Sequence, residues 1–178
     1  SEPKFDVLII LKEANTDGKS DAEESFWFNE TVEATHNGDK SKRSYNTRQN
    51  YAKKFKAVLE ALKIPDADRC RFGYMNLNKR GGFADTTQKQ LTEYSKKYKC
   101  FIRRQIELHD PKIIVFCGCY DSIAKIIFEK DTNGKKIEKW HKRSKSVTVR
   151  LGENDIALYY VYHPAYSGFG KSLSIFNE

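Results

Sequence analysis

The feature that most constrains the fold of this chain is a short, almost entirely apolar run at residues 5–11, which reads FDVLIIL. Its many branched aliphatic residues are typical of a strand that is covered on both faces, as in a parallel sheet. Further strands are predicted at 71–77, 112–118 and 156–162, and a short edge strand at 147–150. We therefore expect a buried, mostly parallel sheet.

Segments with helical spacing separate these strands. The pattern predicts a helix over about 48–62, a long helix over 88–108 that Thr86 or Thr87 caps, and a short helix over 120–128. Strands that alternate with helices predict the α/β class. The expected architecture is a three-layer α/β/α sandwich around a central, mostly parallel four-stranded sheet.

Length and composition are those of one globular domain. The chain has 178 residues, of which 31% are charged and 39% hydrophobic, and we expect a single domain over 1–178. No apolar run is long enough to span a bilayer, and the first residues lack the layout of a signal peptide. We expect a soluble, intracellular protein, cytoplasmic or nuclear, and a monomer.

The formal net charge of +8 favours polyanionic partners, of which phosphate backbones are the commonest. Basic residues are concentrated at 40–56 and at 135–145, and the second of these segments also contains an aromatic residue, Trp140. The generic alternative is a solvated basic surface. The residues expected to contact a DNA backbone are Lys53, Lys54, Lys142 and Arg143.

The four cysteines, Cys70, Cys100, Cys117 and Cys119, have no metal-binding spacing. We interpret them as reduced thiols of an intracellular protein. Neither a metal ion nor another cofactor is expected.

Polar residues follow three of the predicted strands, in the segments 12–15, 76–79 and 163–166. In open α/β sheets, ligands bind beyond the carboxyl ends of the strands, so these segments are expected to line one edge of the sheet. Together they supply a carboxylate, amides and an imidazole. The long polar stretch after the first strand contains the aromatic group FWF at 26–28 and is expected to form a lid or binding loop.

This set of side chains suits an enzyme that removes a base from nucleic acid. Such an enzyme extrudes the nucleotide, stacks its base on an aromatic ring and reads the base edge through hydrogen bonds. The amide of Asn76 matches the edge of uracil, and His163 could stabilise the departing base anion. Glu13 or Asn15 could orient the attacking water, and an aromatic residue of 26–28 could stack on the base.

Four segments, VLIILKEAN, YMNLNK, CFIRRQIELHDPKIIVFCG and YVYHPAY, follow one another in an order that resembles the uracil-DNA glycosylase superfamily. The likeness is greatest to the branch whose first motif reads Gly-Glu-Ala-Pro-Gly. The resemblance implies the glycosylase fold and hydrolysis of the N-glycosidic bond of a flipped uracil, or a related damaged base, in single- or double-stranded DNA during base excision repair.

The resemblance also implies roles for individual residues. Glu13 and Ala14 stand where that branch has Glu-Ala, and Asn76 with Lys79 match its base-binding Asn-x-x-Lys. His163 matches the histidine of its His-Pro motif, which contacts uracil and assists its departure. The candidates for stacking on the base are Phe26 and Phe28, with Trp27 as a further alternative. The candidates for a side chain that wedges into the DNA are Tyr166 and Phe169.

The chain departs from this pattern in its first motif. Lys12 replaces the first glycine, and Asn15-Thr16 replace Pro-Gly, so side chains could narrow the pocket or change its ligand. Cys100 stands where an iron–sulfur branch has one ligand, but the other ligands are missing, so no cluster is expected. These departures favour the main alternative, a non-catalytic module that binds nucleic acid or protein. An unrelated small-molecule hydrolase is a third possibility.

Each candidate residue also has a purely structural interpretation. His163 could close the strand end through a backbone hydrogen bond, Glu13 could pair with a surface lysine, and Asn76 could be a turn residue. The aromatic residues at 26–28 could anchor a long loop to the core.

Overall fold

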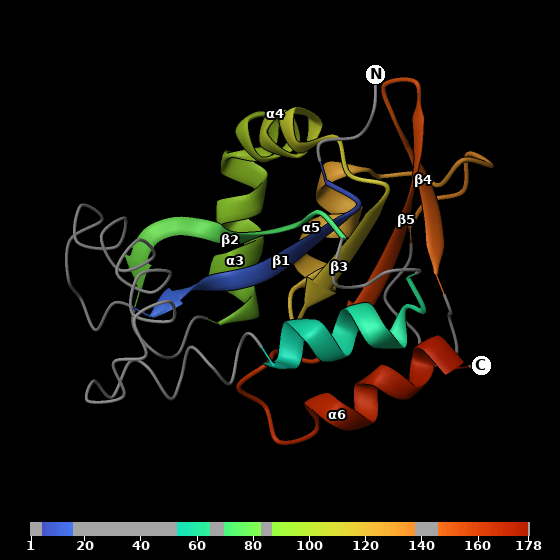
Figure 1. Ribbon diagram of the computed structural model, residues 1–178. Coiled ribbons are helices and arrows are strands. Elements are labelled where there is room, and N and C mark those ends of the chain that lie inside the picture. The colour runs from blue at the N-terminus through green and yellow to red at the C-terminus, as the bar shows by residue number, and fades with distance from the viewer. Residues whose placement is uncertain (1–4, 16–52, 65–69, 83–86, 138–145, 178) are drawn as a thin grey trace.

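The computed structural model describes residues 5–15, 53–64, 70–82, 87–137 and 146–177. In this part of the chain a five-stranded sheet is covered by helices on both faces (Figure 1). The strands are β1 (Val7–Asn15), β2 (Phe72–Gly82), β3 (Ile113–Cys117), β4 (Val147–Leu151) and β5 (Asn154–Val161). The chain therefore has the expected α/β class, but the prediction of a four-stranded sheet was wrong.

The strand order is β2-β1-β3-β5-β4, and all neighbours are parallel except β4, which pairs antiparallel with β5. The fifth strand is the short edge strand that the sequence predicts at 147–150. A tight turn joins it to β5, with Gly152 at φ 62°. Its exposed and buried residues alternate, as in a strand with one face toward solvent.

Two apolar layers lie against the sheet because successive side chains of a strand point to opposite faces. From β1, Leu8 and Ile10 pack with residues of α3 (Gln88–Lys97), α4 (Lys99–His109) and α5 (Tyr120–Ile127). Val7, Ile9 and Leu11 pack on the other face with the helix over 53–61 and with Phe169 of α6 (Phe169–Ser172). The 3-10 helix η1 (Leu173–Asn177) follows α6. Strand β1 is thus buried on both faces, as its sequence predicts.

The long helix predicted over 88–108 is two helices. Tyr98 ends α3 and begins α4, with φ −109° and ψ 20°, which is not a helical conformation. Thr87 caps α3, and it is one of the two residues, Thr86 and Thr87, that were predicted as the cap. Its hydroxyl accepts a hydrogen bond from the Gln90 N–H, while the Gln90 side chain accepts one from the Thr87 N–H, which makes a capping box.

Strands β1 and β2 are longer than predicted and extend beyond their neighbours. Glu13 pairs with Asn78 and Asn15 with Gly82, whereas the pairing of β1 with β3 ends at Leu11 and Cys117. The polar segments at 12–15 and 76–79 therefore lie inside strands, not after them. The predicted loop at 78–82 is also part of β2. In the described residues, no helix is long and apolar enough to cross a membrane.

Candidate functional site

One row of paired residues marks the carboxyl edge of the sheet. Leu11 of β1 is in register with Asn76 of β2 and with Cys117 of β3, and Cys117 is in register with Val161 of β5. His163 follows two residues after Val161. The sheet therefore brings Asn76 and His163 to one edge, as the sequence predicts.

Gly118 lets two of the site side chains approach each other. It follows β3 and has φ 74°, a conformation that favours glycine. A Cβ atom at this position would lie 3.0 Å from the Cβ of His163 and 3.3 Å from the Cε of Lys12. Both side chains thus border the same small space. Any larger residue at 118 would push the imidazole and the lysine apart.

The environment of His163 sets its protonation state. Burial, together with the positive charges of Lys12 and Lys54, lowers the pKa of the imidazole from 6.5 to about 4. The ring is therefore neutral at pH 7. Its Nδ1 accepts a hydrogen bond from the Ala165 N–H, at 3.2 Å, so the ring hydrogen is on Nε2. The structural interpretation of His163, a backbone hydrogen bond at the strand end, is thus confirmed.

Lys54 joins the helix over 53–61 to the loop that follows β5. Its Nζ donates a hydrogen bond to the carbonyl oxygen of Pro164 and lies 5.7 Å from the centroid of the Phe169 ring. No described carboxylate forms an ion pair with Lys12 or Lys54. The edge of the sheet beside His163 therefore carries two positive charges that no described acid neutralises.

Asn76 lies on the same face of the sheet as this helix. Its neighbours Met75 and Leu77 point to the face that α3, α4 and α5 cover, so Asn76 points to the opposite face. The Oδ1 atom of Asn76 is buried and has no hydrogen-bond partner among the described residues. A buried polar atom without a partner is costly, so this oxygen requires a donor from outside the described residues.

Asn76 and His163 are held on strands that are not neighbours. Neighbouring strands lie about 4.8 Å apart, so β2, which contains Asn76, and β5, which His163 follows, are separated by about 14 Å. Strands β1 and β3 lie between them.

The nearby thiols are poor nucleophiles. Cys117 and Cys119 are fully buried, and burial raises the pKa of both thiols. The Cys119 thiol donates a hydrogen bond to the carbonyl oxygen of Ile10, at 3.2 Å. No group of three or more histidine, cysteine or acidic residues in the described ranges could hold a metal ion.

The remaining predicted site residues have different outcomes. Tyr166 is 57% exposed, and its ring packs edge-to-face on Tyr162, with centroids 5.2 Å apart. Lys53 is exposed at the start of its helix. Phe169 is buried among the core residues, so the prediction that its side chain contacts DNA does not fit the structure.

Several predicted residues lie outside what the structure describes. For Glu13, Asn15 and Lys79 it gives the backbone position in β1 or β2 but not the side chain. The predicted stacking and DNA-contact residues outside the described ranges are Phe26, Phe28, Lys142 and Arg143.

The sequence reasoning missed the role of Gly118 and the proximity of Lys12 to the imidazole. A glycine directly after a buried strand can indicate that another segment approaches the backbone closely, so the sequence does contain a signal for Gly118. Nothing in the sequence indicates that the Lys12 side chain reaches across to β3.

Comparisons with known proteins do not identify a family for this chain. No protein-family model matches the chain, and no curated protein matches it.

Proposed function

We propose that this protein is a DNA N-glycosylase that hydrolyses the bond between the sugar and a flipped uracil or related damaged base. The observation that carries this proposal is the neutral imidazole of His163, with its hydrogen on Nε2, at the carboxyl edge of the sheet. A neutral donor at this place can hydrogen-bond an oxygen of the base and strengthen that bond as the base becomes an anion.

The reaction requires little besides positioning and charge stabilisation. The bond between C1′ of the sugar and the base nitrogen breaks, and the electron pair leaves with the base. A water molecule adds its oxygen to C1′ and releases a proton, and the base is released in its protonated form. Glu13 or Asn15 orients this water in the proposal, since both belong to the β1 segment that extends past β3.

Asn76 reads the base in this proposal. Its buried Oδ1 atom lacks a donor, and an N–H of the base edge would supply one. The amide nitrogen can donate to a neighbouring carbonyl of the same base. Uracil offers this pair of groups on one edge, whereas cytosine offers an acceptor and an amino group there.

The two lysines beside His163 support the same chemistry. Burial keeps the imidazole neutral, Lys12 and Lys54 act in the same direction, and their charges also favour a negatively charged base. Lys12 replaces a glycine of the motif that the sequence resembles. Its side chain therefore adds positive charge at the place where negative charge develops.

The same lysine favours a second candidate function, a module that binds a nucleotide or nucleic acid without turnover. The Cε of Lys12 borders the small space beside His163, so it occupies room that a glycine would leave for a flipped base. A site narrowed in this way could hold an anionic ligand and exclude the geometry of base removal.

A base-release assay tests the first proposal. Uracil-containing oligonucleotides, single- and double-stranded, are incubated with the protein and then treated with alkali to cut abasic sites. We expect the wild-type protein to generate abasic sites, and His163→Ala to reduce the rate by about 10² to 10³, as is usual when one donor to a developing anion is removed. His109→Ala is the control, because His109 packs on Phe5 at the end of α4 and should keep wild-type activity.

Measuring binding of the same oligonucleotides separates the two candidates. Binding without base release by the wild-type protein, on uracil and on other damaged bases, would reject the glycosylase and select the binding module. If neither base release nor binding is seen, both candidates are wrong.

A further inference from the structure

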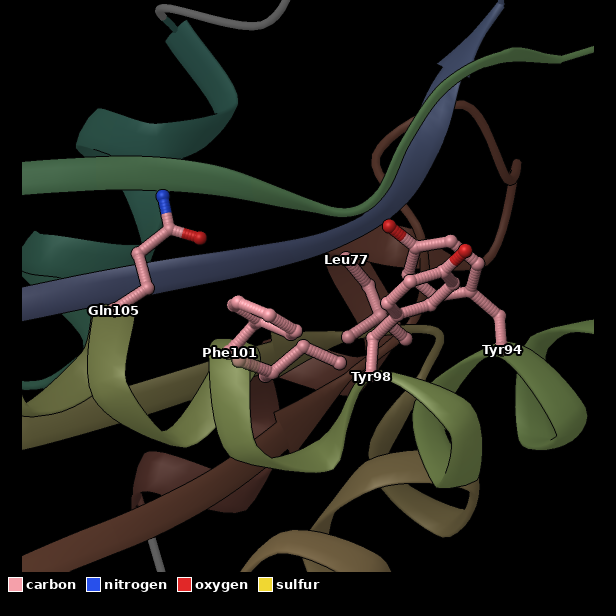
Figure 2. Close-up of a pocket in the computed structure, with 6 residues that line it drawn as sticks. Leu77, Tyr94, Tyr98, Phe101 and Gln105 are labelled. Atoms are coloured by element: carbon pink, nitrogen blue, oxygen red, sulfur yellow. The ribbon is translucent and has the colours of Figure 1, made fainter.

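A second surface, away from the strand ends, has the properties of a peptide-binding groove. Figure 2 shows it between β2 and the helices α3 and α4. The groove has a volume of about 280 Å³, and its lining residues are Leu77, Tyr94, Tyr98, Phe101, Ile102 and Gln105. Leu77 and Ile102 are buried in the core, whereas Phe101 is 75% exposed. An aromatic side chain with such a large exposed fraction, next to an apolar groove, is typical of an interaction site.

The groove borders an edge of the sheet. β2 is the last strand in the order β2-β1-β3-β5-β4, and among the described strands only β1 pairs with it. Within the described part of the chain, its outer edge therefore presents backbone N–H and C=O groups in the spacing of a strand. A peptide strand that pairs there would direct alternate side chains toward α3 and α4, where the groove lies.

The charges around the groove indicate whether its partner is acidic or basic. Helices α3 and α4 together contain six lysine or arginine residues and two glutamates. Lys99 pairs with Glu129, and Arg103 and Arg104 pair with Glu107, so three of the six cations are already matched by described acids. The others are Lys89, Lys96 and Lys97. Lys97, one of these cations, lies over the Tyr98 ring, with its Nζ 5.5 Å from the centroid. The chain as a whole has a net charge of +8, so a second copy would be repelled. The complementary partner is acidic.

The arrangement of the rings favours a peptide over nucleic acid. Single-stranded nucleic acid stacks its bases on open aromatic faces. The rings of Tyr94 and Tyr98 instead pack against each other, with centroids 4.5 Å apart and planes at 42°, and Phe101 is the lining ring that is largely exposed. The Gln105 amide lies on the β2 side of α4 in Figure 2, where backbone groups of an added strand would lie.

From these observations we infer that an acidic peptide segment with alternating apolar side chains binds as an added strand on β2 and inserts an apolar side chain beside Phe101. The partner is thus a protein with an acidic, extended segment. The inference is independent of the proposed reaction, because Asn76 and His163 lie outside the groove lining.

The test uses a fluorescent heptapeptide in which aspartate or glutamate alternates with isoleucine or phenylalanine. We expect saturable binding by fluorescence anisotropy, and Phe101→Ala to weaken it about tenfold or more, as truncation of an aromatic anchor does. Leu108→Ala is the matched control. Leu108 is a 49% exposed apolar residue of α4 that does not line the groove, so its truncation should leave binding unchanged.

Nuclear magnetic resonance on the same complex tests the added strand. Amide signals of Phe72–Leu77 should shift and exchange more slowly with solvent when the peptide binds. The inference is wrong if Phe101→Ala binds like the wild type, or if a lysine-containing peptide or one with proline at alternate positions binds as well. It is also wrong if single-stranded DNA, and not the peptide, binds in a way that depends on Phe101.

Discussion

At the scale of single residues, the surroundings of His163 after the end of β5 determine the protonation state of its ring. The imidazole is partly buried, its Nδ1 accepts a backbone hydrogen bond, and two lysines stand near it. Each of these contacts acts against the charged form, so the ring is a neutral donor through Nε2. Gly118 makes the arrangement sterically possible, because a side chain there would separate Lys12 from the ring.

This arrangement predicts an unusual titration of His163. Its ring signals, followed by nuclear magnetic resonance, should titrate with a midpoint near pH 4 instead of 6.5. Lys12→Met and Lys54→Met should each move the midpoint toward 6.5, because each removes a positive charge that opposes protonation. Lys112→Met is the control, since Lys112 precedes β3 at the opposite edge of the sheet and should not move it. A midpoint near 6.5 in the wild-type protein would contradict the described environment.

The same lowered pKa links protonation to stability. Between about pH 4 and 6.5 the unfolded imidazole binds protons more readily than the folded one, so the free energy of unfolding from this group rises with pH across that interval. The stabilisation that comes from the neutral His163 ring is fully present above pH 6.5 and is lost as the pH falls through 4. His163→Gln should flatten this part of the pH dependence, as urea unfolding at several pH values would show.

At the scale of elements, the start of α3 is fixed by local side-chain bonding. The capping box joins Thr87 to Gln90, and the Gln88 side chain donates to the carbonyl oxygen of Gly118, at 3.3 Å. The first turn of α3 thus lies against the turn that carries the candidate site. Helix capping and the geometry of the site are therefore coupled through Gly118.

Removing the cap should have a measurable cost. Thr87→Ala should lower the free energy of unfolding by about 1 kcal/mol, because the Gln90 N–H loses its acceptor. Thr92→Ala, in the interior of the same helix, should have a smaller effect, since alanine has the higher helix propensity. Urea unfolding of both variants checks this. Equal losses of stability would show that the cap does not hold the helix start.

The sequence predicted most elements of the described fold, because their signals are local. Apolar runs located β3 and β5, and the short edge strand predicted at 147–150 is β4. The extension of β1 to Asn15 was missed, because Lys12, Glu13 and Asn15 are polar and the extension is visible only in the pairing of the backbone with β2. The break at Tyr98 was also missed. Leu91 and Ser95 of α3 and Ile102 and Ile106 of α4 are buried at intervals that continue through it.

The site was predicted only as far as topology allows. The rule that ligands bind at strand ends placed His163 after β5, whereas Asn76 lies inside β2, level with the last residue of β3. It could not locate Lys12 or Lys54 beside the imidazole, because those approaches depend on the turn at Gly118 and on how a helix packs across the sheet. Contacts between distant segments have no local signal in a single sequence.

At the scale of the whole molecule, the net charge of +8 predicts how DNA binding should respond to salt. The affinity for an oligonucleotide should fall steeply as salt rises, with a slope on logarithmic axes of about 0.9 for each phosphate neutralised. Lys53→Met should lower that slope by about one, because Lys53 is exposed on the helix beside the site. Titrations at several salt concentrations measure the slope.

The control for this measurement is again Lys112→Met, which removes one charge from the opposite edge of the sheet. It should leave the slope unchanged if the DNA lies along the strand ends. Equal slopes for all three proteins would place the DNA elsewhere, and an affinity independent of salt would exclude binding through phosphates.

The position of β1 in the sheet also has a consequence for synthesis on the ribosome. β1 pairs with β2 on one side and with β3 on the other, and both partners come much later in the chain. A nascent chain therefore displays Val7–Leu11 with open backbone edges until Ile113–Cys117 has left the exit tunnel. During that interval this apolar segment is a target for chaperones and for self-association, so translation speed and chaperone supply should limit the yield of folded protein.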